Sequence, residues 1–108
     1  MNIVSIPTNK GVRTFAISDI IRVEAISNYS KVYFVNEYPL TVAKVLRWFE
    51  EKLCENSFYR IHRGHIVNCI YITSILRDSR IILSNGEVLR VSNRKKTAFR
   101  NEFSLDMG

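Results

Sequence analysis

The sequence of 108 residues is long enough for one hydrophobic core, and we expect a single domain over residues 1–108. Its composition, 46% hydrophobic and 24% charged, is that of a globular protein, and the lack of a long apolar run or leader-like start predicts a cytoplasmic protein without membrane association. The formal net charge of +6 is concentrated in residues 60–100, which hold nine lysines and arginines against two acidic residues, so DNA, RNA or another polyanion is the favoured partner.

The first part of the chain alternates β-branched and aromatic residues with turn-forming residues, a pattern typical of short antiparallel strands. We expect five strands there, over residues 2–6, 12–17, 23–26, 29–35 and 38–42. Ser18 and Asp19 are expected to form a single turn, and Pro39 marks the fifth strand as an edge strand.

One amphipathic helix is predicted over residues 41–55. Its apolar residues recur at spacings of three and four: Val42, Val45, Leu46, Phe49 and Leu53. Charged residues occupy the other side, so the helix is expected to cover one face of a sheet.

The last third of the chain predicts a strand over residues 71–76 and a hairpin in which residues 80–84 pair with residues 87–91 across Asn85 and Gly86. Ser92 is expected to cap a short basic helix over residues 94–103. Together these elements predict a mainly β domain with antiparallel strands, one amphipathic helix and a short C-terminal helix.

The segment of residues 58–68 places two arginines, two histidines and a glycine between apolar residues. Its apolar ends can be anchored in a core by Phe58, Ile61, Ile66 and Val67. Residues 60–65 are then left as a cationic projection with a flexible glycine at its tip, a design suited to reading the edge of a nucleic acid.

Catalysis and metal binding are not supported by the sequence, so we predict no enzyme, cofactor or metal. His62 and His65 form an H-x-x-H pair, but on an extended segment they are expected on opposite faces, and a third ligand is not nearby. Cys54 and Cys69 match no metal spacing or nucleophile motif and are expected to be reduced thiols in or near the core. The glycines are isolated, which argues against a phosphate-binding loop.

Three polar segments carry the residue types of nucleic-acid recognition: residues 27–31, 60–65 and 92–96. Arginine and asparagine have the donor and acceptor geometry to read bases, whereas lysines, hydroxyls and backbone amides bind phosphates. Two alternatives remain at this point. One is an RNA-binding β module that stacks bases on exposed tyrosines, and the other is a protein-interaction module whose basic face meets an acidic partner.

Four motifs together resemble the LytTR family of bacterial DNA-binding domains: I-x-x-V-E-A at 20–25, N-Y-S-K-V at 28–32, F-Y-R-I-H-R-G-H-I-V-N at 58–68 and N-G-E-V-L-R-V-S-N-R at 85–94. The resemblance implies about three small antiparallel sheets and sequence-specific binding of double-stranded DNA by loop side chains in successive major grooves. It also implies a bacterial transcription regulator, either stand-alone or the output domain of a two-component response regulator, that binds paired direct repeats. A second copy on DNA and an N-terminal receiver or sensor domain outside this sequence are compatible with it.

The resemblance places Ser30 and Lys31, then His62, Arg63 and Gly64, and then Asn93 and Arg94 in three DNA-contacting loops. The chemistry of these side chains and of their neighbours divides the candidates into two groups. Candidates for base contacts are Ser30, His62, Arg63, Asn93 and Arg94. Candidates for phosphate contacts are Tyr29, Lys31, Arg60, Gly64, His65, Ser92, Lys95 and Lys96. Gly64 replaces a serine common in the family, and Asn93 stands where many members have arginine, so a different target sequence is expected. For His62 the alternative is a hydrogen bond to the backbone that fixes its loop.

Overall fold

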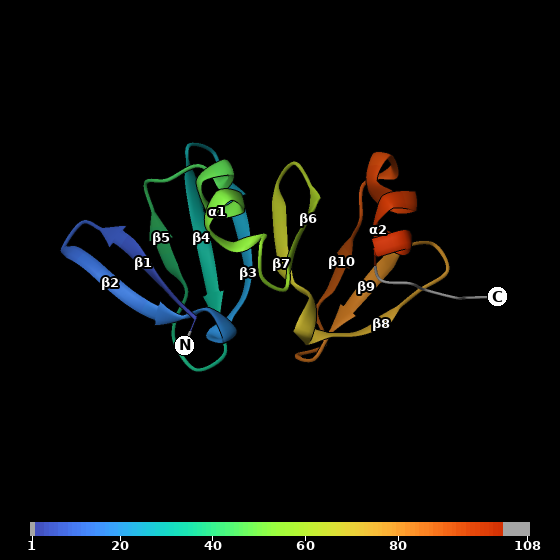
Figure 1. The fold of residues 1–108 in the computed structure, drawn as a ribbon, viewed down its shortest axis with the longest axis horizontal. Helices are drawn as coiled ribbons and strands as arrows, with labels where there is room; N and C mark the ends of the chain where they lie inside the picture. Colours follow the sequence, from blue (N-terminus) through green and yellow to red (C-terminus); the bar gives the residue numbers. More distant parts are fainter. Residues whose placement is uncertain (1, 103–108) are drawn as a thin grey trace. The chain divides into compact units, whose positions relative to one another are not determined.

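A computed structural model of the chain describes residues 2–102 (Figure 1). Within these residues the fold is mainly β, with three antiparallel sheets and two α-helices, which confirms the predicted fold class. The contacts divide the chain into an N-terminal unit that ends at Ile70 and a C-terminal unit that begins at Tyr71. Neither α-helix of the described part is long and apolar enough to cross a membrane.

The N-terminal unit contains a two-stranded and a five-stranded sheet. Its strands are β1 (Ile3–Thr8), β2 (Gly11–Ala16), β3 (Ile20–Ile26), β4 (Tyr29–Phe34), β5 (Leu40–Val42), β6 (Phe58–His62) and β7 (His65–Asn68). β1 pairs with β2, and the larger sheet has the order β5-β4-β3-β7-β6. The predicted turn at Ser18 and Asp19 is a 3-10 turn over Ile17–Asp19.

The core of this unit lies between the five-stranded sheet and helix α1 (Leu46–Leu53), which covers one face of the sheet (Figure 1). Phe49 and Leu53 are fully buried against sheet residues such as Val23. The β1–β2 hairpin joins the same core, because Phe15 of β2 stacks on Phe34 of β4 with ring centroids 4.5 Å apart. Burial of each such side chain contributes about 1.5–3 kcal/mol.

Helix α1 is shorter than the sequence predicted. Thr41 and Val42 belong to strand β5, where they pair with Lys31 and Ser30 of β4, and the helix begins at Leu46. The predicted start of the helix was wrong because Val42 is a buried strand residue that lies four residues before Leu46. This distance equals the spacing of apolar residues on one face of a helix.

The C-terminal unit is a three-stranded sheet with one helix. Its strands are β8 (Ile72–Ile75), β9 (Arg80–Leu83) and β10 (Val88–Arg90), in the order β10-β9-β8. A 3-10 turn over Asn93–Lys95 leads into helix α2 (Lys96–Glu102). The buried apolar residues of the C-terminal unit are Ile81, Leu83, Val91 and Phe99. Residue 103 of the predicted helix lies outside the described residues. The prediction that Ser92 caps this helix was wrong, because Ser92 precedes the 3-10 turn and its side chain makes no capping hydrogen bond. Its carbonyl oxygen instead accepts a hydrogen bond from the Lys95 N–H.

The β9–β10 hairpin forms as predicted, but its loop has three residues rather than two. Ile82 pairs with Val88, and the Leu83 N–H donates a hydrogen bond to the Glu87 carbonyl oxygen, which leaves Ser84, Asn85 and Gly86 in the loop. Gly86 has φ +89°, a value that favours glycine, and the Asn85 side chain accepts a hydrogen bond from the Glu87 N–H.

Asp78 closes the turn between β8 and β9. It accepts hydrogen bonds from the backbone N–H and the guanidinium of Arg80. The backbone hydrogen bond is the main reason that the pKa of Asp78 lies below its ordinary value, and the Arg80 side chain adds to the effect.

Candidate nucleic-acid interface

Two of the three predicted recognition segments lie side by side at one end of the five-stranded sheet. The β3–β4 turn is formed by Ser27 and Asn28, and the β6–β7 turn by Arg63 and Gly64. β3 runs antiparallel to β7, and near its end the Ala25 N–H donates a 2.9 Å hydrogen bond to the Gly64 carbonyl oxygen. A backbone hydrogen bond therefore joins the β6–β7 turn to the end of β3, two residues before the β3–β4 turn.

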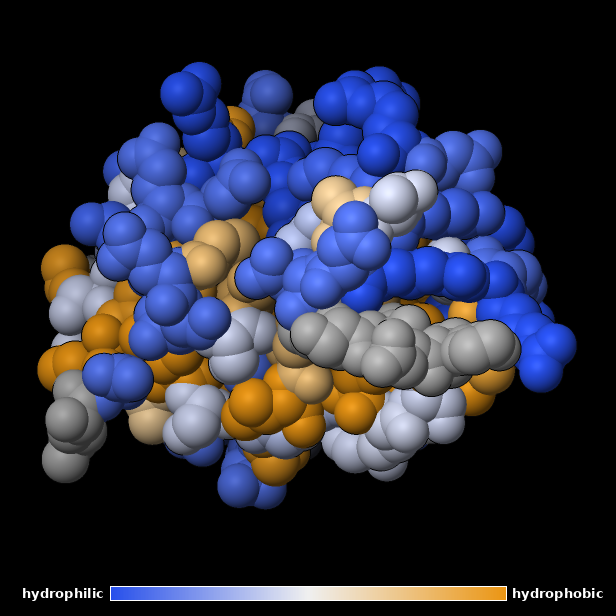
Figure 2. All heavy atoms as spheres, turned by 45° about the vertical axis from the view of Figure 1, so that its right-hand side comes forward, coloured by the Kyte–Doolittle hydropathy of each residue, from blue (hydrophilic) through white to orange (hydrophobic). Residues whose placement is uncertain are grey.

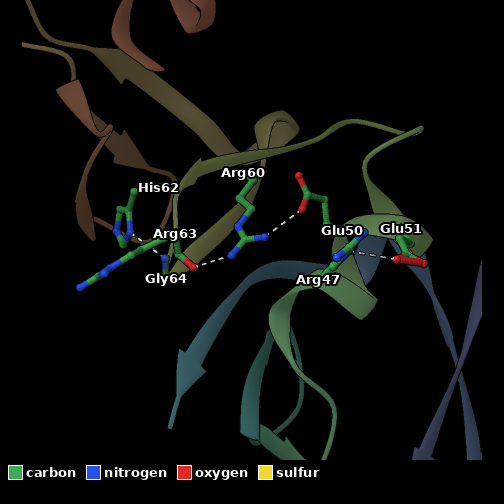
Figure 3. Close-up of polar contacts among 7 residues, drawn as sticks. All are labelled: Arg47, Glu50, Glu51, Arg60, His62, Arg63 and Gly64. Atoms are coloured by element: carbon green, nitrogen blue, oxygen red, sulfur yellow. Dashed lines mark hydrogen bonds and ion pairs between the residues drawn. The ribbon is translucent and has the colours of Figure 1, made fainter. Parts of the chain in front are cut away.

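The backbone of the β6–β7 turn is fixed by its neighbours (Figure 3). Arg60 Nη2 donates to the Arg63 carbonyl oxygen at 2.6 Å, and the Gly64 N–H donates to His62 Nδ1 at 3.0 Å. The Arg63 side chain is exposed and extends away from these contacts (Figure 3). The turn therefore presents one guanidinium on a rigid support.

Gly64 does not act as the flexible tip that the sequence suggested. Both of its backbone polar groups are hydrogen-bonded, the N–H to His62 and the carbonyl to Ala25. A Cβ at this position would lie 3.3 Å from His62 Cε1, so a larger residue would press on the imidazole that holds the turn.

His62 and His65 are neighbours across the hairpin, which corrects the expectation that they point to opposite faces. The segment is a hairpin and not one extended strand, so the two residues pair, with ring centroids 5.5 Å apart. Among the described residues, groups of three or more potential metal ligands are absent.

His65 is buried and serves the sheet. Its Nε2 lies 2.8 Å from Nη1 of the buried Arg22. Because a guanidinium only donates, Nε2 is the acceptor, and the neutral imidazole carries its proton on Nδ1. Burial removes His65 from the residues that can reach a phosphate.

Arg22 also packs flat on an aromatic ring. Its Cζ lies 3.6 Å from the centre of the Tyr33 ring, and the Tyr33 hydroxyl donates to Glu24 at 3.1 Å. Glu24 lies 3.7 Å from Arg22, so its charge is balanced within the sheet. The Tyr33 face that Arg22 covers is closed to a stacking base.

Ser30 is fully buried and cannot reach a base in this structure. Its hydroxyl donates to the Lys44 carbonyl oxygen at 2.6 Å, which ties β4 to the segment that enters α1. The next residue, Lys31, points to the other face of the strand and lies 5.3 Å from the Tyr33 ring. Tyr29, at the start of β4, is exposed.

The third predicted segment lies in the C-terminal unit. Asn93 and Arg94 are exposed in the 3-10 turn, and Ser92, Lys95 and Lys96 are partly exposed. Figure 2 shows the hydrophilic surface that this turn and helix α2 present. Arg100 fastens α2 to the β8–β9 turn by hydrogen bonds to the Arg77 carbonyl and to the Ser79 hydroxyl.

Two residues at this candidate interface were not singled out individually by the sequence analysis. Asn28 is exposed at the tip of the β3–β4 turn, next to Ser27 with φ 55°. It was part of a predicted recognition segment, and its place between two strands was the signal that could have selected it. Glu50 of α1 pairs with Arg60 at 2.9 Å, a contact that local sequence patterns do not encode.

Three comparisons relate the chain to known proteins. The model of the family described as "LytTr DNA-binding domain" matches residues 10–104. The solved LytTr DNA-binding domain of a putative methyl-accepting/DNA response regulator from Bacillus cereus is 28% identical, with a TM-score of 0.81, and the match covers 97% of this chain and 99% of that one. The sensory transduction protein LytR of Staphylococcus haemolyticus (strain JCSC1435) is 31% identical over 64 residues. That match covers 56% of this chain and 25% of the relative, so it spans about a quarter of the curated protein's length.

Proposed function

The chain belongs to the LytTR family of DNA-binding domains, and from this premise we propose that it binds double-stranded DNA sequence-specifically, with side chains of its turns in the major groove. The observation that carries the proposal is the exposed Arg63 on a turn whose backbone is hydrogen-bonded to β3 and to Arg60. An arginine held in this way can donate two hydrogen bonds to the edge of a guanine. The family is defined by DNA binding and not by catalysis.

In the N-terminal unit we assign base reading to Arg63 and Asn28, and phosphate binding to Lys31 and Tyr29. All four lie in or close to the β3–β4 and β6–β7 turns and carry polar groups of the kinds that bind phosphates or base edges. His62 is partly exposed, so its imidazole can contact DNA while Nδ1 supports the turn.

Four of the predicted contacts are assigned to support instead. The polar groups of Ser30, Arg60 and His65 are engaged with Lys44, Glu50 and Arg22 respectively. Gly64 is placed with them because its N–H is bonded to His62.

In the C-terminal unit we assign base reading to Asn93 and Arg94, and phosphate binding to Ser92, Lys95 and Lys96. Arg94 follows Asn93 in an exposed turn, so either side chain has access to a groove edge.

Lys95→Ala should weaken binding to specific and random duplexes by a similar factor. Loss of one phosphate contact should also lower the slope of log K against log salt concentration by about one. Fluorescence anisotropy at a series of salt concentrations measures both quantities. A loss confined to the specific duplex would instead make Lys95 a base-reading residue.

We further propose that the chain acts in a bacterial transcription regulator in the cytoplasm, as the output domain of a response regulator or alone. The named relatives, a sensory transduction protein and a response regulator, support this context. Four further expectations stay predictions. They are paired direct repeats as the target, a second copy bound beside the first, a receiver or sensor segment, and a single domain over residues 1–108.

The test is selection of bound DNA from a randomised duplex pool, followed by sequencing and titration at two salt concentrations. Enrichment of two similarly oriented half-sites about one helical turn apart supports the proposal. Salt-dependent binding without an enriched motif contradicts sequence specificity, and tighter binding to RNA would favour an RNA-binding module. An RNA-binding module needs exposed aromatic rings on which bases can stack. Arg22 covers one face of the Tyr33 ring, whereas Tyr29 is exposed next to the β3–β4 turn, so the aromatic surface beside this turn is small.

A further inference from the structure

Arg60 connects helix α1 to the tip of the β6–β7 turn (Figure 3). One amino group, Nη1, donates to Glu50 Oε1 at 2.9 Å, and the other, Nη2, donates to the Arg63 carbonyl oxygen at 2.6 Å. The Arg60 side chain is 22% exposed and that of Glu50 38% exposed. The planar guanidinium therefore bonds the carboxylate and the carbonyl at the same time.

This arrangement constrains the residue that we assign to base reading. Fixing the Arg63 carbonyl fixes the peptide plane from which the Arg63 side chain departs. A recognition side chain must be held within about 0.5 Å of its productive position, and neighbours that lock it supply that precision. Glu50 does so indirectly, because it orients the guanidinium that holds the carbonyl.

We propose that Glu50, acting through Arg60, is a positioning residue for base reading by Arg63. The inference rests on the proposed DNA-binding function. It reverses the simplest electrostatic expectation, which is that a carboxylate beside a DNA-binding turn repels phosphates and that its removal only strengthens binding. We expect removal of the Glu50 charge to strengthen non-specific binding and to weaken discrimination.

Glu51 offers a matched control on the same helix. It pairs with Arg47 at 3.6 Å, and both side chains are well exposed, at 67% and 82%. Figure 3 shows this pair beside the Glu50–Arg60 pair. Glu50→Gln and Glu51→Gln remove the same charge, keep the side-chain size and have nearly equal helix propensity. They differ in whether the lost carboxylate is linked to the Arg63 carbonyl.

The experiment measures the affinity of the wild-type protein and both variants for a selected duplex and for a random duplex, at several salt concentrations. Both variants should bind the random duplex slightly more tightly. The ratio of specific to non-specific affinity should fall about 2- to 10-fold for Glu50→Gln, the range expected for one net hydrogen bond, and stay constant for Glu51→Gln. Unfolding curves followed by Trp48 fluorescence confirm that each variant is folded.

A double-mutant cycle with Arg60→Lys tests the route of the effect. Lysine keeps the charge but cannot bond two acceptors with a planar fork, so Arg60→Lys should lower the ratio as Glu50→Gln does. The double variant should lose little more than either single variant, because both act through one link.

The affinities distinguish a failure of the proposed DNA binding from a failure of the positioning role of Glu50. A wild-type protein without preference for any duplex contradicts the proposed function itself. A wild-type protein that discriminates, together with equal ratios for Glu50→Gln and Glu51→Gln, overturns the positioning role and leaves the function standing.

Discussion

Phe49→Ala is expected to lower the free energy of unfolding by about 3–5 kcal/mol, the range for deleting a buried aromatic side chain. Phe49 is fully buried in the layer between α1 and the five-stranded sheet. Its removal leaves a cavity between the helix and the sheet, which the backbone hydrogen bonds of the sheet prevent from closing. The same helix carries Glu50, so the loss acts on the support of the recognition turn as well as on the fold.

Urea denaturation of the variant, followed by circular dichroism, measures this loss. The midpoint should fall while the dependence on urea concentration stays the same, because the surface exposed on unfolding hardly changes. Arg47→Ala is the control on the same helix: its side chain is 82% exposed, and a change of about 0.5 kcal/mol is expected. Phe49→Leu, with an expected cost of about 1.5 kcal/mol, keeps the comparison measurable if the alanine variant does not fold. A loss for Phe49→Ala no larger than for Arg47→Ala would contradict the assigned core.

The sequence predicted the elements whose signals are local. Residues Asn85 and Gly86 located the β9–β10 hairpin, and alternation of apolar residues located most strands. Boundaries that depend on pairing could not be predicted in this way. The start of α1 was missed because Thr41 and Val42 pair with β4, although Val42 has the spacing of a helical residue.

The sequence could not show which side chains of the candidate site are accessible. Arginine, histidine and serine in a polar segment suggest contact with DNA, yet Ser30 and His65 are buried. Their partners, Lys44 and Arg22, lie 14 and 43 residues away in sequence, and only the packed sheet brings them together. Sequence patterns report which side chains can bind a phosphate, whereas tertiary contacts decide which of them are already engaged.

Arg63→Ala is expected to cost about 1–3 kcal/mol of specific binding, roughly a 5- to 150-fold loss of affinity, and to relax the preference at one base pair. Arg63 is exposed, and its turn is held by Arg60, His62 and Ala25, so the loss removes one guanidinium without dismantling its support. Binding to a random duplex should weaken far less, because the variant loses only one of the positive charges that attract the phosphates.

Arg63→Lys separates reading from charge. Lysine keeps the positive charge but not the two parallel donors that match a guanine edge, so the variant should retain non-specific binding and lose most of the preference at the same base pair. Selection from a randomised duplex pool with each variant identifies that position directly. If Arg63→Lys binds the wild-type target with wild-type preference, Arg63 binds a phosphate. Base reading must then reside in the other exposed turn residues of the two units, Asn28, Asn93 and Arg94.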